Sequence, residues 1–193
     1  MRSLLSAFAL SAVVFTTPSS YAQSADDDFD PVFAFNQICY TKIPNVAAIQ
    51  DMAVQLAWSA LPDADIESIQ ALENPDLSLG WDAKIGERLF RVGVNQGAAT
   101  AAMVTTFPSF EGGRATTCSL VLDDMFPADI ILQNMQTLAG KEPLSSGVPE
   151  DGLETTTWAG GNDQLKVFLF AKVNQAVGGG LLHVTLLEHP SNL

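Results

Sequence analysis

The sequence has few of the side chains on which catalytic and metal sites depend. Among its 193 residues are two histidines, His183 and His189, and two cysteines, Cys39 and Cys118. It has no CxxC, HExxH or GxSxG motif, and no glycine-rich stretch is followed by the Lys-Ser/Thr of a phosphate-binding loop. Two isolated cysteines without a histidine cluster also make a poor zinc site. We therefore expect neither a metal nor a cofactor.

Basic residues are scarce as well. Nine Lys and Arg stand against 22 Asp and Glu, which gives a formal charge of −13. Phosphate backbones and anionic lipid head groups repel such a chain, so nucleic acid and membrane surfaces are disfavoured as partners. Two explanations of the acidity stay open. One is solubility, and the other is recognition of a basic partner, such as an extracytoplasmic enzyme of the lysozyme kind that this chain would inhibit.

No apolar run is long enough to span a bilayer. Residues 4–15 form a run of roughly a dozen residues, whereas a spanning helix needs about 20. The run follows Arg2 and leads to small residues that end at Ala22, the pattern of a secretory signal. We predict a signal peptide over residues 1–22, cleaved before Gln23. A lipoprotein would need a cysteine there. The mature protein is then expected to be soluble, periplasmic or secreted, and not inserted in a membrane.

The expected mature chain begins with an acidic segment. Residues 23–30 contain four aspartates and predict a disordered N-terminus. A calcium loop counted from Asp26 would need Gly and Glu where Pro31 and Gln37 stand, so the pattern does not fit one. Residues 31–193 are enough for a single domain with a sizeable core.

The two cysteines predict one structural disulfide. An even count in an oxidising compartment favours a Cys39–Cys118 bridge. Closing a ring of roughly 80 residues contributes about 4.5 kcal/mol in the chain-entropy account.

Hydrophobic periodicity predicts an α+β fold, an antiparallel sheet of about six strands with two main helices packed on one face. Apolar steps of three and four residues predict a helix over residues 44–60, and Pro127 and Gly140 bound a second over 127–139. Shorter helices are expected over 32–39 and 63–72, and loops over 77–86 and 141–154. Strands are predicted over 88–94, 99–107, 114–122, 155–159, 165–173 and 182–187.

The terminal hairpin offers a candidate interaction face. Two aromatics and two of the scarce cations share one side of it, because side chains alternate along a strand. The face consists of Lys166, Phe168, Phe170, Lys172, His183 and Leu187. The alternative is that a helix covers the phenylalanines. A run of small residues from Gly93 to Ala102 likewise permits close approach of a helix or a ligand.

His183 is the weak candidate for catalysis, as the general base of an extracytoplasmic hydrolase. A histidine with satisfied hydrogen bonds on a strand is the alternative. His189 lies six residues further on, about 20 Å away on an extended strand, so the two cannot share a metal.

The layout resembles a loose class of small proteins exported by Gram-negative bacteria, a class with no known activity. The resembling parts are the signal peptide, residues 35–39, the alanine-rich helix ending in Trp58, residues 118–121 and Trp158 before the final hairpin. The resemblance implies a single exported α+β domain with one disulfide. We expect a non-catalytic periplasmic binding or protein-interaction module that takes a protein or small ligand. The hydrolase and the acidic inhibitor stay as alternatives, and the oligomeric state stays open.

Overall fold

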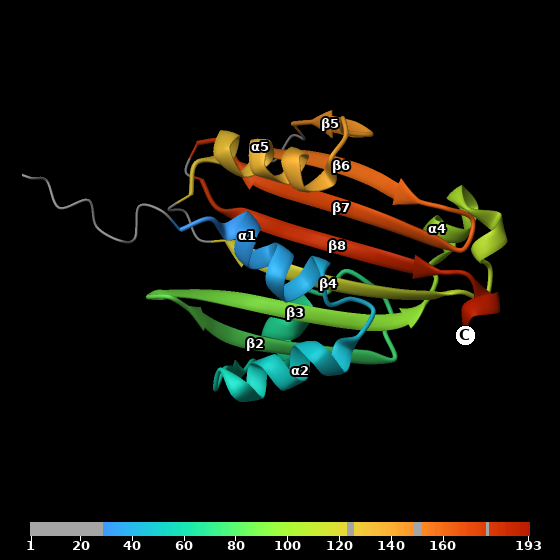
Figure 1. Cartoon of the computed structure of the whole chain (residues 1–193), viewed down its shortest axis with the longest axis horizontal. Coiled ribbons are helices and arrows are strands. Elements are labelled where there is room, and N and C mark those ends of the chain that lie inside the picture. The colour runs from blue at the N-terminus through green and yellow to red at the C-terminus, as the bar shows by residue number, and fades with distance from the viewer. Residues whose placement is uncertain (1–28, 123–125, 149–151, 177) are drawn as a thin grey trace, which may run out of the picture.

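A computed structural model describes residues 29–122, 126–148, 152–176 and 178–193, which form one antiparallel sheet with helices on both faces (Figure 1). The predicted signal peptide and residues 23–28 of the acidic segment lie outside this described part. The strand order is β1-β2-β3-β4-β8-β7-β6-β5. The strands are β1 (Ser59–Ala60), β2 (Leu77–Ile85), β3 (Arg88–Ala98), β4 (Arg114–Leu122), β5 (Ser145–Gly147), β6 (Leu153–Gly161), β7 (Leu165–Asn174) and β8 (Gly180–Glu188).

The sheet therefore has eight strands, and the predicted number of about six was wrong. The stretch predicted as a loop over residues 77–86 is mostly strand β2. The alternation of side chains along β2 is interrupted by Gly80. A larger side chain at this position would clash with Leu61 and Ile66, which pack against the strand. The edge strands β1 and β5 span two and three residues, too few to show a period.

In the residues that the structure describes, five α-helices and one π-helical turn accompany the sheet. Residues 99–107 were predicted as a strand, but the segment contains a helix, α4, whose N-terminus is capped by the Thr100 hydroxyl accepting from the Met103 amide. A short apolar run does not distinguish the two structures. The helices are α1 (Pro31–Phe35), the π-helix η1 (Asn36–Tyr40), α2 (Val46–Gln55), α3 (Asp63–Ser68), α4 (Ala101–Thr106) and α5 (Ala128–Ala139), with 3₁₀ turns η2 (Pro108–Phe110) and η3 (Pro190–Asn192).

One face of the sheet is covered by α1, η1, α2 and α5, which lie in front of it in Figure 1. The main core lies between these layers, and its fully buried members include Phe35 on α1 and Val94, Leu120 and Val184 on the central strands. The predicted disulfide is confirmed. Cys39 on η1 and Cys118 on β4 are bonded with a Cα–Cα distance of 5.3 Å.

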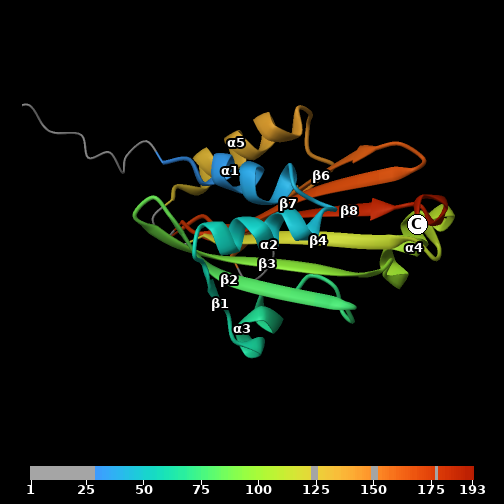
Figure 2. The same ribbon diagram turned by 60° about the horizontal axis from the view of Figure 1, so that its bottom comes forward.

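The other face carries α3 and α4. Figure 2 shows α3 on the side of the sheet away from α2. The segment after α3 approaches β3 closely, because Gly93 lies under Ile69 and Gly97 under Pro75. Within the described part of the chain, no helix is long and apolar enough to cross a membrane.

Candidate functional site

A pocket of about 700 Å³ opens between α1, η1 and the end of α2, above the β2–β3 turn. We call it the α1–α2 pocket. Its lining is mostly apolar, with polar groups from three side chains. The lining residues are Phe29, Asp30, Phe33, Ala34, Gln37, Ile38, Met52, Leu56, Trp58, Lys84, Ile85 and Gly86.

The first wall is set by the start of the helical segment. Asp30 caps α1, because its carboxylate accepts from the Val32 amide at 2.8 Å, and Pro31 takes the first helical position, where its missing N–H is not needed. In this helix Phe35 is fully buried in the core, while Phe33 is 64% exposed at the pocket. The chain continues as the π-helix η1, which is held to the sheet by Cys39.

The second wall is the end of α2. Ile49 and Ala53 bury the inner stripe of the helix, and Leu56 lies at the pocket with 57% of its surface exposed. Ala57 then adopts a left-handed conformation with φ of 53°, and the Trp58 amide donates to the Ala53 carbonyl. This pattern terminates a helix and is normally supplied by glycine. The helix predicted to reach residue 60 therefore ends at Gln55, and the turn brings the Trp58 side chain into the pocket lining.

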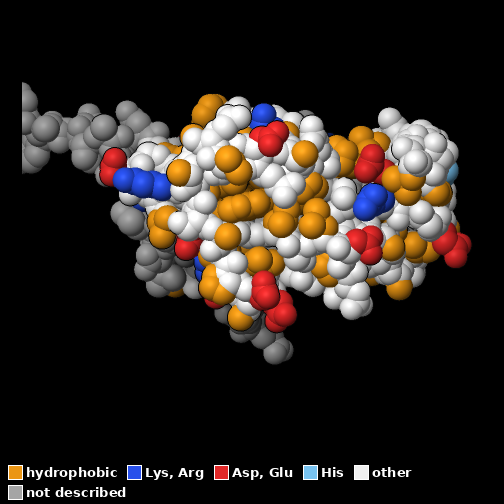
Figure 3. Space-filling view, turned by 90° about the horizontal axis from the view of Figure 1, so that it is seen from below, with side chains coloured by type: hydrophobic (Ala, Val, Ile, Leu, Met, Phe, Trp, Pro, Cys, Tyr) orange, Lys and Arg blue, Asp and Glu red, His pale blue; other side chains and the backbone are white. Residues whose placement is uncertain are grey.

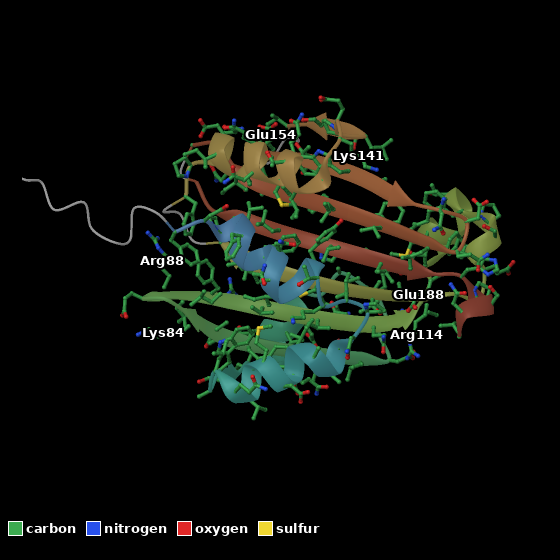
Figure 4. The ribbon with its side chains drawn as sticks, in the orientation of Figure 1. Lys84, Arg88, Arg114, Lys141, Glu154 and Glu188 are labelled. Atoms are coloured by element: carbon green, nitrogen blue, oxygen red, sulfur yellow. A yellow bond between two sulfur atoms is a disulfide. The ribbon has the colours of Figure 1, made fainter. Side chains whose placement is uncertain are left out.

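Charged side chains lie beside the pocket and are engaged in contacts within the chain. Lys84 is paired with Glu87 at 3.1 Å, and both side chains are largely exposed. The Arg88 guanidinium lies over the rings of Phe29 and Phe126, at 5.8 and 4.7 Å from their centres. Figure 4 shows Lys84 and Arg88 at the same end of the sheet. An aromatic ring that lines the pocket thus already contacts a cation.

Apolar surface continues outside the pocket. Figure 3 shows hydrophobic side chains gathered in the middle of the face seen from below, the side that Figure 2 turns forward with β1, α2 and α3. Val54, on α2 but outside the pocket lining, is 81% exposed. An apolar rim of this kind is typical of a surface that meets a ligand or partner.

Two indole N–H groups, those of Trp58 and Trp158, are buried and have no hydrogen-bond acceptor among the described residues. Leaving a buried donor unpaired costs about 1–3 kcal/mol, which the packing of the rings offsets. Trp58 is therefore held in the pocket lining by packing and by its backbone, not by a polar anchor.

His183, the candidate catalytic residue, lies on the opposite face of the sheet from the α1–α2 pocket. Its Nδ1 is 2.9 Å from the Ser119 hydroxyl, and its Nε2 is 2.8 Å from the Thr185 hydroxyl. The rings of Phe170 and His183 meet edge to face at 6.4 Å. All three polar side chains are buried, and none of them lines the α1–α2 pocket.

The ring of His183 is enclosed by buried hydroxyl groups. The Ser119 hydroxyl reaches both Nδ1 at 2.9 Å and the Ile69 carbonyl at 3.4 Å, so either tautomer of the ring satisfies these contacts. Desolvation by burial lowers the pKa of His183 from 6.5 to about 4, so the ring is neutral at pH 7. A general base must be reachable by its substrate, and His183 and Ser119 are both buried and outside the lining of the α1–α2 pocket. The arrangement fits a neutral histidine that satisfies a buried polar row.

That polar row extends across the sheet. Asn95, also buried, accepts from the Ala71 amide and from the Thr117 hydroxyl and donates to Ser78. It fixes the segment after α3 on β3 and β4. The sequence contains a signal for this network, because its polar residues stand at alternate positions of otherwise apolar strands. The network itself was not predicted.

The residues of the predicted hairpin face divide into two groups. At one end, Phe168 packs against Phe107 at 5.5 Å, Lys166 lies over the same ring, and Leu187 is fully buried beside η2. At the other end, Phe170 and Lys172 are half-buried, and His183 is buried. The structure thus brings the six residues onto one face, and the segment of α4 and η2 covers part of it.

The α1–α2 pocket was not predicted. Its residues come from three separate stretches, the segment 29–38, the end of α2 and the turn after β2, and no motif joins them. Phe33 and Leu56 are apolar like the core residues of their segments, and the sequence does not show that both stay more than half exposed.

Comparison with known proteins gives no relative. No protein-family model matches the chain, no curated protein matches it, and no solved structure matches it.

Proposed function

We propose that this chain is an exported, non-catalytic binding module and that it captures its ligand in the α1–α2 pocket. The observation that carries the proposal is the pocket itself, an apolar concavity with a few polar groups at its edge. Ligand sites typically have volumes of roughly 300–1,000 Å³ and this kind of lining. The pocket is built on helices that the disulfide holds to the sheet, which gives it a rigid base.

The terminal hairpin face, the site expected from the sequence, has less support. Its aromatic residue Phe168 already has a partner within the chain, Phe107, and Leu187 has no exposed surface. The hydrolase alternative also has less support, because His183 and Ser119 are both buried and neither lines the α1–α2 pocket. Export and periplasmic location are part of the proposal and rest on residues 1–22 and on the disulfide.

Binding of a neutral apolar fluorophore, N-phenyl-1-naphthylamine, tests the pocket. We expect its fluorescence to rise on mixing with the mature chain and the rise to be lost in Leu56→Asp. Leu56 is already more than half exposed, so the variant should fold. The matched control is Val54→Asp, which places the same charge two residues before Leu56, on α2 and outside the pocket lining. Equal fluorescence in all three proteins would contradict the proposal.

A further inference from the structure

We propose that a second hollow, beside Lys141, binds a small carboxylate whose body is apolar. The hollow has a volume of about 260 Å³ and lies between the end of η1, the end of α5 and the β6–β7 hairpin. We call it the Lys141 hollow. Its lining residues are Tyr40, Ala139, Lys141, Trp158, Ala159, Gly160, Gly161, Val167 and Leu169. It shares no lining residue with the α1–α2 pocket, so the inference goes beyond the proposed function and does not depend on it.

The charge of the hollow comes from Lys141. The helix α5 ends at the left-handed Gly140, and the ammonium of the next residue donates to the Ala159 carbonyl at 2.6 Å. Figure 4 shows Lys141 beside β6. The carbonyl is neutral and takes one of the three N–H donors. No carboxylate of the described residues forms an ion pair with Lys141, and its neighbour Glu142 accepts from Gln136 at 3.2 Å. The ammonium thus keeps its charge and two donors for a ligand.

The position of this ammonium depends on Gly160. A Cβ at that residue would lie 3.0 Å from the Lys141 Nζ, closer than an ordinary contact. Gly160 is not one of the glycines with positive φ, so its backbone conformation is open to other residues. The close approach of Lys141 is therefore the feature for which glycine is needed here.

The walls of the hollow suit an apolar body with an acceptor group. Ala139, Val167 and Leu169 supply apolar surface, and no carboxylate is found among the described residues that line it. Trp158 also lines the hollow, and its buried indole N–H has no acceptor among the described residues. A buried donor of this kind needs an explanation, and a carboxylate oxygen bound beside the ring is one.

The size and the fixed walls favour a small molecule. The volume is below the roughly 300–1,000 Å³ that is typical of sites for drug-sized ligands. Two walls belong to one hairpin, and Tyr40 directly follows Cys39, which the disulfide holds to β4. The chain carries a formal charge of −13, but salt screens charges that lie more than about 10 Å apart. The ammonium at contact distance therefore decides the sign of the charge that binds.

The test compares 3-phenylpropionate with its neutral analogue 3-phenylpropionamide. Each is titrated into the mature chain, and binding is followed by two-dimensional NMR of the backbone amides. We expect the acid to shift the signals of Ala159, Gly160 and Gly161 in a saturable way. The neutral analogue should bind at least about tenfold more weakly, because it makes no charge-assisted hydrogen bond. Equal affinity of the two would overturn the carboxylate, and shifts confined to other parts of the chain would overturn the site.

Two variants test the residues that form the site. Lys141→Gln keeps a donor for the Ala159 carbonyl but removes the charge, so it should weaken binding of the acid about tenfold. The matched control is Lys84→Gln, which removes one positive charge at the α1–α2 pocket and should bind the acid as the parent does. Gly160→Ala should also weaken the acid by displacing the ammonium, whereas Gly147→Ala on β5, where a Cβ meets open space, should not. Unchanged binding of the acid in Lys141→Gln would overturn the inference.

The outcomes for the two sites are separate. Lys141→Gln should leave binding of the fluorophore unchanged, and Leu56→Asp should leave binding of the acid unchanged. If 3-phenylpropionate does not bind, the Lys141 hollow is wrong as a site and the proposed function stands. If Leu56→Asp abolishes binding of both ligands, the acid also enters the α1–α2 pocket and the second site is wrong.

Discussion

The bond between Cys39 and Cys118 joins the helical wall of the α1–α2 pocket to β4, a central strand of the sheet. Cys39 directly follows Ile38, which lines the pocket, and both residues are buried. The disulfide therefore fixes one side of the proposed binding site as well as closing a long loop.

Removing this bond should cost both stability and binding. The two cysteines are 79 positions apart, and constraining a loop of that length contributes about 4.5 kcal/mol in the chain-entropy account. We expect the Cys39→Ala, Cys118→Ala double variant to lose several kcal/mol of unfolding free energy in urea titration. Its remaining folded fraction should bind the fluorophore more weakly. A double variant as stable as the parent would show that the bridge has no structural role.

The buried histidine should make stability depend on pH. His183 has a pKa of about 4 in the folded chain and about 6.5 when unfolded. Between these values the unfolded chain binds the extra proton, so stability is fully present above pH 6.5 and is lost as the pH falls toward 4. The loss amounts to about 3 kcal/mol, from the difference between the two pKa values.

Urea titration at pH 7 and at pH 4.5 measures this loss. Because carboxylates also titrate in this range, the relevant quantity is the difference from His183→Gln, whose stability should fall less on acidification. His189→Gln is the control and should follow the parent. If His183→Gln loses as much stability as the parent, titration of His183 is not the cause.

Ala57 predicts a stabilising substitution. It is the one non-glycine residue with positive φ in the part of the chain that the structure describes, and that conformation costs an L-residue about 1–2 kcal/mol. Ala57→Gly should therefore raise the unfolding free energy by about 1 kcal/mol, although glycine elsewhere in a helix usually lowers it. The control is Ala47→Gly inside α2, which should destabilise. A destabilised Ala57→Gly variant would contradict the left-handed turn before Trp58.

An element of this fold could be predicted from the sequence where its residues show a clear hydrophobic period bounded by turn signals. The strand β7 and the helix α5 carry clear periods bounded by turn signals, and both appear where those signals placed them. Each of the two cysteines had one possible intramolecular partner, so their pairing could be predicted without knowing the structure. In contrast, α4 and the edge strands are too short to show a period. In β2, Gly80 interrupts the alternation of side chains, and a larger residue at that position would clash with Ile66.

The pocket could not be predicted for a different reason. Whether Phe33 and Leu56 meet across a groove depends on the conformation of Ala57, on the π-turn of η1 and on the disulfide, none of which is encoded in the spacing of those residues. The histidine was visible in the sequence, but its enclosure was not. Ser119 reaches it because β4 and β8 are adjacent in the sheet, whereas Thr185 lies two residues further along the same strand.

Export can be checked directly. The small residues ending at Ala22 predict cleavage before Gln23. Mass spectrometry of the protein recovered from the periplasm of an expressing bacterium should give the mass of residues 23–193. Titration of this product under denaturing, non-reducing conditions should find no free thiol. An intact chain in the cytosolic fraction would contradict export.

The most direct test of the central claim is hydrogen–deuterium exchange of the mature chain with and without N-phenyl-1-naphthylamine. Binding in the α1–α2 pocket should slow amide exchange in residues 29–40, at the end of α2 up to Trp58, and at the β2–β3 turn, with β7 and β8 unchanged. Protection of β7 and β8 instead would place the binding site on the terminal hairpin and contradict the assignment of the pocket.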